Sequence, residues 1–279
     1  MFVAEDGIAN EPAPKLPDLT GIRILLAEDN KTNQIVATQM LQTMKAEVTV
    51  ASDGYEALLK FENGNFDLAL LDIEMPRMSG LDVLRAIRAR TDARANTPLV
   101  ALTAYAMREH KERIAAAGAN GLIPKPLISI ESFGRALLDY LGIDPNLTVP
   151  TPEPTSNSGA SGETIDGQIY QSLRDTIGAE SMGELLEKVV EDIKSVKEGL
   201  ISGVRDDDHP VIRSNTHVLI SVAGAIGATS LQSLAERLNA AAHANNDKAI
   251  AQLSAECISG IALAEDFLAR EQEQIRRAV

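Results

Sequence analysis

The stretch Leu68-Ala-Leu-Leu-Asp72-Ile-Glu-Met-Pro76-Arg-Met-Ser-Gly80 decides the fold of the first half of the chain. A short apolar run ends on the carboxylate of Asp72, and Met-Pro and Ser-Gly, which interrupt regular structure, follow within a few residues. This pattern predicts a buried parallel strand that presents one acid at its C-terminal end. Ligands of open, doubly wound sheets bind at that edge. We therefore expect Asp72 to lie in a functional site.

Strand and helix patterns alternate on both sides of this stretch. Short apolar runs predict strands, and apolar residues spaced three or four apart predict helices. The expected strands are 22–27, 48–51, 68–72, 99–103 and 121–124. The expected helices are 33–44, a segment after Gly54, 81–90, 108–117 and 130–141. Five such pairs predict an α/β domain with an open parallel sheet covered on both faces.

Composition divides the chain into four segments. Residues 1–20 predict a flexible leader, and the α/β domain is expected over 21–143. Residues 144–164, rich in Pro, Ser and Thr, predict a linker. From 165 to 279 every segment has helical periodicity, with expected helices at 166–177, 181–204, 209–225, 229–244 and 247–277. A separate all-α domain, built as a helical bundle, is therefore predicted.

Charge and composition exclude several classes of function. The chain has 26 basic and 40 acidic residues, and its net charge of -14 opposes direct binding to nucleic acid, whose phosphates require basic groups. No segment is apolar and long enough to cross a bilayer, and no signal-peptide pattern is present, so we expect a cytoplasmic protein without membrane insertion. The single cysteine, Cys257, has apolar neighbours and is expected to be buried.

Polar residues follow the expected strands. Glu28 and Asp29 follow the first strand and Asp72 ends the third, so parallel strands would bring three carboxylates together. Crowded carboxylates repel one another unless a hard cation lies among them, and Mg²⁺ prefers such ligands. The fourth and fifth strands end near Thr103, a hydroxyl donor, and Lys125, a mobile positive charge. The set predicts a phosphoryl-transfer site with Asp72 as the nucleophile.

Four motifs around these residues resemble the receiver domain of two-component response regulators. They are Glu28-Asp29-Asn30, the run from Leu71 to Gly80, Ala101-Leu102-Thr103-Ala104 and Pro124-Lys125-Pro126. The resemblance covers 21–141 and implies a flavodoxin-like (βα)5 fold. It implies that Asp72 is the phosphoacceptor, that Asp29 binds Mg²⁺ beside Glu28, and that Glu74 is a ligand through its backbone carbonyl. It also implies that Thr103 is the switch hydroxyl and Lys125 the phosphate-binding lysine.

One position departs from that family. Receivers usually carry Tyr or Phe three residues before the lysine, whereas this chain has Leu122. A leucine has neither a hydroxyl nor a flat ring to report the movement of Thr103. Tyr105 lies close to Thr103 in the sequence and could take a related part. We therefore expect a relay or phosphate-sink role before an output switch.

One histidine of the second domain has a distinctive setting. On the helical face that follows His217 the residues are Ser221, Gly224 and Ala228, all small, which leaves the imidazole open to a bulky partner. An imidazole is a competent nucleophile toward an acyl phosphate. Arg213, one turn earlier, could pair with phosphoryl oxygens. The alternative is a partly exposed helix histidine without a function.

The surroundings of His217 are similar to the histidine phosphotransfer (HPt) domain, which that family builds as a four-helix bundle with an extra N-terminal helix. The family commonly has His, any residue, Leu, Lys, Gly, and this chain has His217-Val-Leu-Ile220-Ser221. Ser221 keeps the approach open. Ile220 removes the cation expected beside a phosphohistidine, so a lysine there is expected to speed phosphorylation. The other histidines, at 110, 209 and 243, are expected to be solvated or helix-start residues.

These features predict a phosphorelay protein and not an enzyme with a turnover substrate. A histidine kinase or hybrid kinase would phosphorylate Asp72, and His217 would exchange phosphate with this receiver or with other receiver or HPt domains. The chain resembles the C-terminal part of a hybrid kinase, and no ATP-binding motif supplies a donor. One alternative makes the bundle a non-phosphorylated interaction or dimerisation module. Another, an aspartyl-nucleophile phosphatase, is disfavoured because Asp72 lacks the usual Asp-any-Asp pattern.

Overall fold

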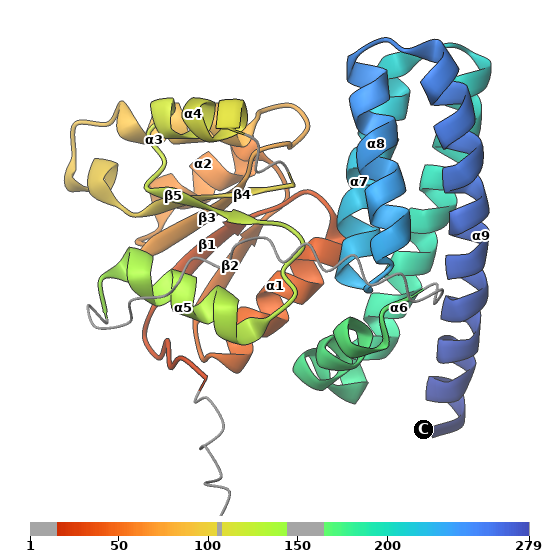
Figure 1. Ribbon diagram of the computed structural model, residues 1–279. Helices are drawn as coiled ribbons and strands as arrows, with labels where there is room; N and C mark the ends of the chain where they lie inside the picture. Colours follow the sequence, from red (N-terminus) through yellow and green to blue (C-terminus); the bar gives the residue numbers. More distant parts are fainter. Residues whose placement is uncertain (1–15, 105–107, 144–164, 279) are drawn as a thin grey trace, which may run out of the picture.

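The structure is a computed structural model that describes residues 16–104, 108–143 and 165–278 (Figure 1). The predicted linker at 144–164 and most of the predicted leader lie outside the described residues, as does Tyr105. Within the described part, a parallel sheet with helices on both faces lies beside a helical region, residues 165–278 (Figure 1).

The sheet has the predicted strands in the order β2-β1-β3-β4-β5, and all its neighbours are parallel. The strands are β1 (Arg23–Ala27), β2 (Glu47–Ala51), β3 (Leu68–Asp72), β4 (Leu99–Thr103) and β5 (Gly121–Pro124). All five residues of β3 are buried, which explains its uninterrupted apolar sequence, because both faces of a central parallel strand are covered. The predicted flavodoxin-like (βα)5 fold is therefore confirmed.

Helices cover the two faces of the sheet (Figure 1). One layer contains α1 (Lys31–Thr43) and α5 (Ile130–Leu141), and the other contains α2 (Gly54–Asn63), α3 (Gly80–Arg88) and α4 (Arg108–Ala116). A short 3₁₀ helix, η1 (Ala93–Asn96), precedes β4. Side chains before the helices cap them: Asn30, Asp53 and Ser79 each accept a hydrogen bond from a backbone N–H of the first turn. The capped helices α1 and α3 begin in the chain after β1 and β3, whose C-terminal ends carry the polar residues.

The ordered part of the chain begins earlier than the predicted boundary at Gly21. Leu19 is fully buried, and its backbone N–H donates to the carbonyl of Met44 over 2.7 Å. The composition of 1–20 concealed this single apolar anchor among prolines and acids. The prediction of a flexible leader is therefore wrong for Leu19 and its neighbours.

The helical region follows the predicted pattern closely. Its helices are α6 (Gly167–Arg205), α7 (His209–Ala225), α8 (Thr229–His243) and α9 (Asp247–Ala278). The first two predicted helices form one long element, α6, interrupted at Gly178, whose φ of 78° lies in the left-handed region that glycine tolerates. Cys257 is buried here, as predicted, and burial raises the pKa of its thiol to about 12. None of the described helices is long and apolar enough to cross a membrane.

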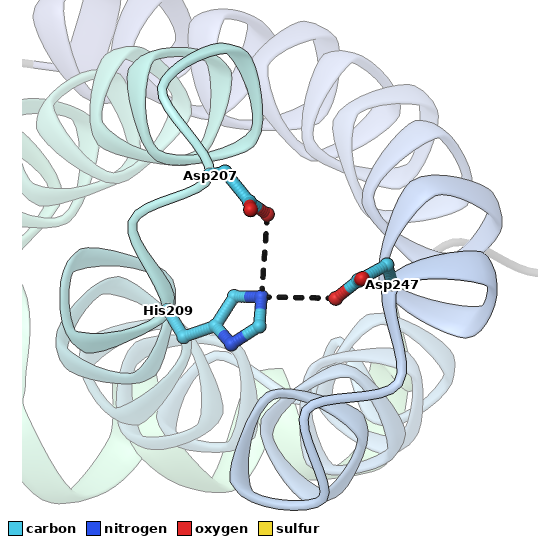
Figure 2. A group of neighbouring side chains, drawn as sticks. All are labelled: Asp207, His209 and Asp247. Carbon is cyan, nitrogen blue, oxygen red and sulfur yellow. Dashed lines mark ion pairs between the residues drawn. The ribbon is translucent and has the colours of Figure 1, made fainter.

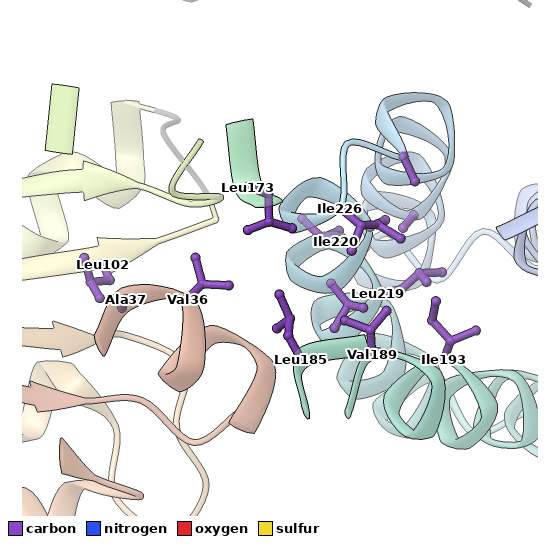
Figure 3. Close-up of a cluster of buried hydrophobic side chains, with 14 of the residues drawn as sticks. Val36, Ala37, Leu102, Leu173, Leu185, Val189, Ile193, Leu219, Ile220 and Ile226 are labelled. Atoms are coloured by element: carbon purple, nitrogen blue, oxygen red, sulfur yellow. The ribbon is translucent and has the colours of Figure 1, made fainter. Parts of the chain in front are cut away.

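A continuous apolar cluster joins the helical region to the sheet domain (Figure 3). Val36 of α1 faces Leu173 and Leu185 of α6, and Ile220 of α7 lies in the same cluster (Figure 3). These side chains are at most 4% exposed. Apolar burial of this kind stabilises contact by roughly 25 cal/mol per Å² removed from water. The two parts of the chain are thus packed against each other through α1.

A polar cluster links two turns of the helical region (Figure 2). His209 Nε2 lies 3.4 Å from Asp207 Oδ1 and 3.2 Å from Asp247 Oδ1, and its Nδ1 lies 2.8 Å from the side-chain oxygen of Asn245. The hydrogen bond to Asn245 raises the pKa of His209, and the two carboxylates add to the rise against the opposing effect of burial. His209 is therefore a largely buried clamp, whereas His243 is exposed, as predicted.

This clamp predicts a pH-dependent contribution to stability. Because the folded-state pKa of His209 lies above its usual value, its contribution is fully present below about pH 6.5 and is lost as pH rises through the folded pKa. His209→Gln should therefore lower the thermal unfolding midpoint more at about pH 5.5 than at about pH 8.5. The control is His243→Gln, on the exposed end of α8. Equal losses for His209→Gln at both pH values would contradict the clamp.

Candidate functional site

The predicted acidic residues meet at the C-terminal edge of the sheet. Ala27 of β1 pairs with Leu71 of β3, so the residues that follow both strands lie side by side. One carboxylate oxygen from each of Glu28, Asp29 and Asp72 lies within 4.8 Å of the others. Glu28 and Asp72 are each 1% exposed, and Asp29 is partly buried.

Lys125 reaches this cluster from the end of β5. Its Nζ lies 2.7 Å from Asp72 Oδ2 and 3.2 Å from Glu28 Oε2, and the side chain is buried. Its backbone N–H donates to the carbonyl of Thr103 over 2.8 Å, which aligns the strand ends. Burial alone would lower the pKa of Lys125, but the two carboxylates raise it further than burial lowers it. Lys125 therefore stays protonated and positively charged.

The buried carboxylates of this cluster are only partly compensated by positive charge. The pKa of Glu28 is raised to about 7, because burial and the charges of Asp72 and Asp29 together outweigh the opposing effects of Lys125 and of the hydrogen bond from Asn33. Burial, followed by the charge of Asp72, also raises the pKa of Asp29. One lysine is thus too little compensation for three carboxylates.

The donor set fits a hard divalent cation. Every donor is an oxygen, which suits Mg²⁺ and does not suit soft metals. Glu28, Asp29 and Asp72 could hold such an ion, which would reverse the upward pKa shifts of the carboxylates and neutralise phosphoryl oxygens. The role of the Glu74 backbone carbonyl as a further ligand stays a prediction.

Residues after β3 and β4 complete the pocket around Asp72. The Glu74 N–H donates to Asp72 Oδ1 over 3.2 Å, which fixes the carboxylate. Thr103 is buried at the end of β4, next to β3 in the sheet. Gly80 lies directly against the carbonyl of Asp72, so any side chain there would collide with the backbone of Asp72. Leu122 is partly buried and packs on the apolar layer of α2, α3 and α4.

His217 of α7 lies at the rim of the same pocket. Its Nδ1 is 2.8 Å from Glu74 Oε2, and its side chain is 14% exposed. Burial lowers the pKa of His217, but the Glu74 carboxylate raises it by more, and the charges of Lys125 and Asp72 act on it as well. The same contact lowers the pKa of Glu74 against the effect of burial. The structure therefore brings His217 into the electrostatic field of the acidic site.

The small residues after His217 face the sheet domain of the same chain. A Cβ on Gly224 would lie 2.5 Å from Cγ of Pro126, so only glycine permits this approach. Ser221 is 2% exposed and Ala228 is fully buried. The face predicted to be open to a bulky partner is thus covered, at Gly224, by Pro126 of the same chain. Within the described residues the side chain of Arg213 forms no ion pair or hydrogen bond, so its predicted phosphate contact stays a prediction.

The setting of Ile220 is apolar. Its side chain is 1% exposed and lies in the apolar cluster between α1, α6 and α7 (Figure 3). A lysine at this position would bury a charge among apolar side chains. Ile220 is therefore a packing contact, and the effect of Ile220→Lys on phosphorylation stays a prediction.

The sequence did not predict the polar contacts between the sheet domain and the helical region. Asp192 Oδ2 of α6 accepts hydrogen bonds from Thr32 Oγ1 over 2.7 Å and from Asn30 Nδ2 over 3.0 Å. The side chain of Glu74, predicted only as a backbone ligand, contacts His217. No sequence pattern identifies these pairs, since they join residues more than a hundred positions apart. The one signal in the sequence for these contacts is that Asn30 belongs to the motif Glu28-Asp29-Asn30.

Part of the chain matches a known protein family, and the chain is similar to several known proteins. Residues 24–133 match the family described as the response regulator receiver domain. The chain is similar to the aerobic respiration control sensor protein ArcB of Escherichia coli, 30% identical over 224 residues, and the alignment covers 79% of this chain and 28% of that protein. It is also similar to sensor protein GacS of Pseudomonas syringae, with 28% identity, and that alignment covers 84% of this chain and 27% of GacS. The chain thus spans less than a third of these relatives.

Solved structures add one comparison with a metal. The receiver domain of a sensor histidine kinase from Pseudomonas aeruginosa, described with a magnesium ion coordinated in the active-site cleft, is 34% identical. The similarity covers 44% of this chain and 99% of that chain, with a TM-score of 0.41.

The acidic cluster predicts a proton-linked metal site. Asp29→Asn should weaken Mg²⁺ binding by at least about 10-fold, because it removes one carboxylate from the donor set. Binding to the unaltered chain should weaken as pH falls below about 7, since the raised pKa of Glu28 keeps that carboxyl protonated. Titration calorimetry in buffers of different ionisation enthalpy measures both effects. Glu62→Gln, on the exposed surface of α2, is the control, and unchanged binding by Asp29→Asn would refute the site.

Proposed function

We propose that this chain, whose residues 24–133 form a response regulator receiver domain, is a phosphorelay protein in which Asp72 and His217 exchange a phosphoryl group. The observation that carries the proposal is the position of His217. Its imidazole lies at the rim of the pocket of Asp72, held at 2.8 Å by Glu74, a residue two positions after the proposed phosphoacceptor.

The receiver pocket supplies the groups for phosphate chemistry at Asp72. The carboxylate of Asp72 attacks the phosphorus of a donor, and the leaving group takes the electron pair of the broken bond. Lys125 stands 2.7 Å from Asp72 and offers a positive charge to the incoming oxygens. The hydroxyl of Thr103, at the end of β4, would donate to one of these oxygens. Bound Mg²⁺ would neutralise the remaining charge.

Transfer to the histidine follows from the same geometry. When Nδ1–H donates to Glu74, the neutral ring carries its lone pair on Nε2. Nε2 forms a bond to phosphorus as the bond between phosphorus and the Asp72 oxygen breaks, and that oxygen keeps the electron pair. Glu74 stabilises the positive charge that develops on the ring. The reverse step uses the same atoms, so the relay can run in either direction.

The helical region fits the role of a histidine phosphotransfer bundle. Its helices pack against one another around an apolar core, and His217 lies on α7 at the face that meets the receiver. The alignment with ArcB reaches into the helical region, because 79% of the chain cannot fit within its first 164 residues, so part of that region is shared with a sensor protein. We propose a histidine kinase as the donor, since the relatives are named sensor proteins and sensor histidine kinases.

A second function is favoured by the burial of Ile220. An apolar residue replaces the cation expected near a phosphohistidine, so the helical region could be a docking module that covers the receiver without accepting phosphate. The site of covalent label separates the two functions. Label on the helical region supports the relay, and label confined to the receiver supports the docking module.

The relay predicts two chemically distinct labels. With acetyl phosphate as donor, Asp72→Asn should abolish all label, because the nucleophile is lost. His217→Gln should retain the alkali-labile aspartyl phosphate and lose the alkali-stable phosphohistidine. The control is His243→Gln, which is exposed at the end of α8. Uptake by Asp72→Asn would place the nucleophile elsewhere, and unchanged alkali-stable label in His217→Gln would remove that histidine from the relay.

Glu74 is predicted to position His217. Glu74→Gln keeps the size of the side chain and removes its charge, so transfer from Asp72 to His217 should slow by roughly 10-fold, the lower end for a hydrogen bond to a charged group because the Glu74 side chain is 44% exposed. Uptake by Asp72 from acetyl phosphate should persist. Rapid-quench kinetics separate the two steps. A transfer rate equal to that of the unaltered chain would show that Glu74 is a bystander.

A further inference from the structure

One polar contact between the two parts of the chain lies away from the reacting groups. Asp192, in the C-terminal half of α6, accepts from Thr32 Oγ1 at 2.7 Å and from Asn30 Nδ2 at 3.0 Å through the same oxygen. Asn30 is held in place because its Oδ1 caps α1 by accepting from the N–H of Asn33. Thr32 is fully buried in the first turn of the same helix. Asn30 is therefore held by a contact with α1 that does not involve Asp192.

The charge of Asp192 is met by neutral donors. Among the described residues no lysine or arginine forms an ion pair with it, and the nearby Lys188 pairs instead with Glu191 at 2.6 Å. A partly buried carboxylate that loses its hydrogen-bond donors keeps the cost of desolvation. The contact is thus favourable with a receiver that presents donors at both positions and unfavourable with one that does not.

We infer that Asp192 is a specificity-determining residue that selects receivers carrying neutral hydrogen-bond donors at the first and third positions after the Glu-Asp pair. In this chain these positions are Asn30 and Thr32. A receiver with a carboxylate or an apolar side chain there would face Asp192 with repulsion or an unmet acceptor, which disfavours the wrong partner. The inference rests on the proposed phosphotransfer, and it names the partner class: this receiver and receivers with the same donor pair.

The test offers one phosphohistidine donor a choice of receivers. The donor is the full chain with Asp72→Asn, labelled on His217 by phosphoramidate. The acceptors are two full chains with His217→Gln, one otherwise unaltered and one with Asn30→Asp and Thr32→Val. Aspartate caps a helix as well as asparagine does, and valine has the shape of threonine, so the second acceptor should fold. Its uptake from acetyl phosphate normalises the comparison.

The expected preference is about 10- to 100-fold in initial rate for the unaltered acceptor, the range for hydrogen bonds to a charged group. Asp192→Asn in the donor should reduce this preference severalfold or more, because an amide can donate to the aspartate at position 30. Glu191→Gln, a neighbouring carboxylate whose side chain is 69% exposed, should leave the preference unchanged. Equal rates to both acceptors, or an Asp192→Asn donor with undiminished preference, would overturn the inference.

A measurement without phosphate separates this inference from the proposed function. In the single full chain, amides of α1 should exchange hydrogen faster after Asn30→Asp and Thr32→Val, and Asp192→Asn on that background should restore part of the protection. If no donor labels any acceptor, the proposed phosphotransfer fails and hydrogen exchange still tests the contact. Unaltered exchange in both variants would overturn the role of Asp192.

Discussion

The structure depends on one buried lysine placed between carboxylates. Lys125 contacts Asp72 and Glu28 at the edge of the sheet, and its charge makes the burial of both acids possible. Removing an ion-pair partner from a buried site is costly, because it leaves an uncompensated charge. The compensation is incomplete, since the pKa of Glu28 is still raised to about 7. The pocket therefore favours the binding of further positive charge.

The contact between the receiver and the helical region combines apolar and polar interactions. Val36 and Ile220 lie in a continuous apolar cluster, which supplies attraction without direction (Figure 3). Asp192 and Glu74 supply direction, because hydrogen bonds and ion pairs depend on geometry. Gly224 removes the steric barrier to Pro126. Together these contacts aim His217 at the acidic pocket, while the His209 clamp fixes the turns of the same region (Figure 2).

Sequence patterns located most of the elements, and their failures have physical causes. Leu19 was assigned to a flexible leader because a single buried side chain leaves no periodicity in a proline-rich segment. Ile220 was interpreted as a lost cation because comparison with a motif addresses one helix at a time, whereas burial at that position depends on α1 and α6. Glu74 was expected to act through its backbone, and only the neighbouring helix revealed a contact for its side chain.

The sequence by itself determined the parallel sheet, the meeting of Glu28, Asp29 and Asp72, the approach of Lys125 and the helical character of the second half. These follow from local periodicity and from the rule that parallel strands end at a common edge. Only the tertiary structure decided that His217 faces this pocket and that Asp192 meets Asn30 and Thr32. Such pairs join distant positions through packing between two domains, and packing depends on surfaces that no single stretch of sequence contains.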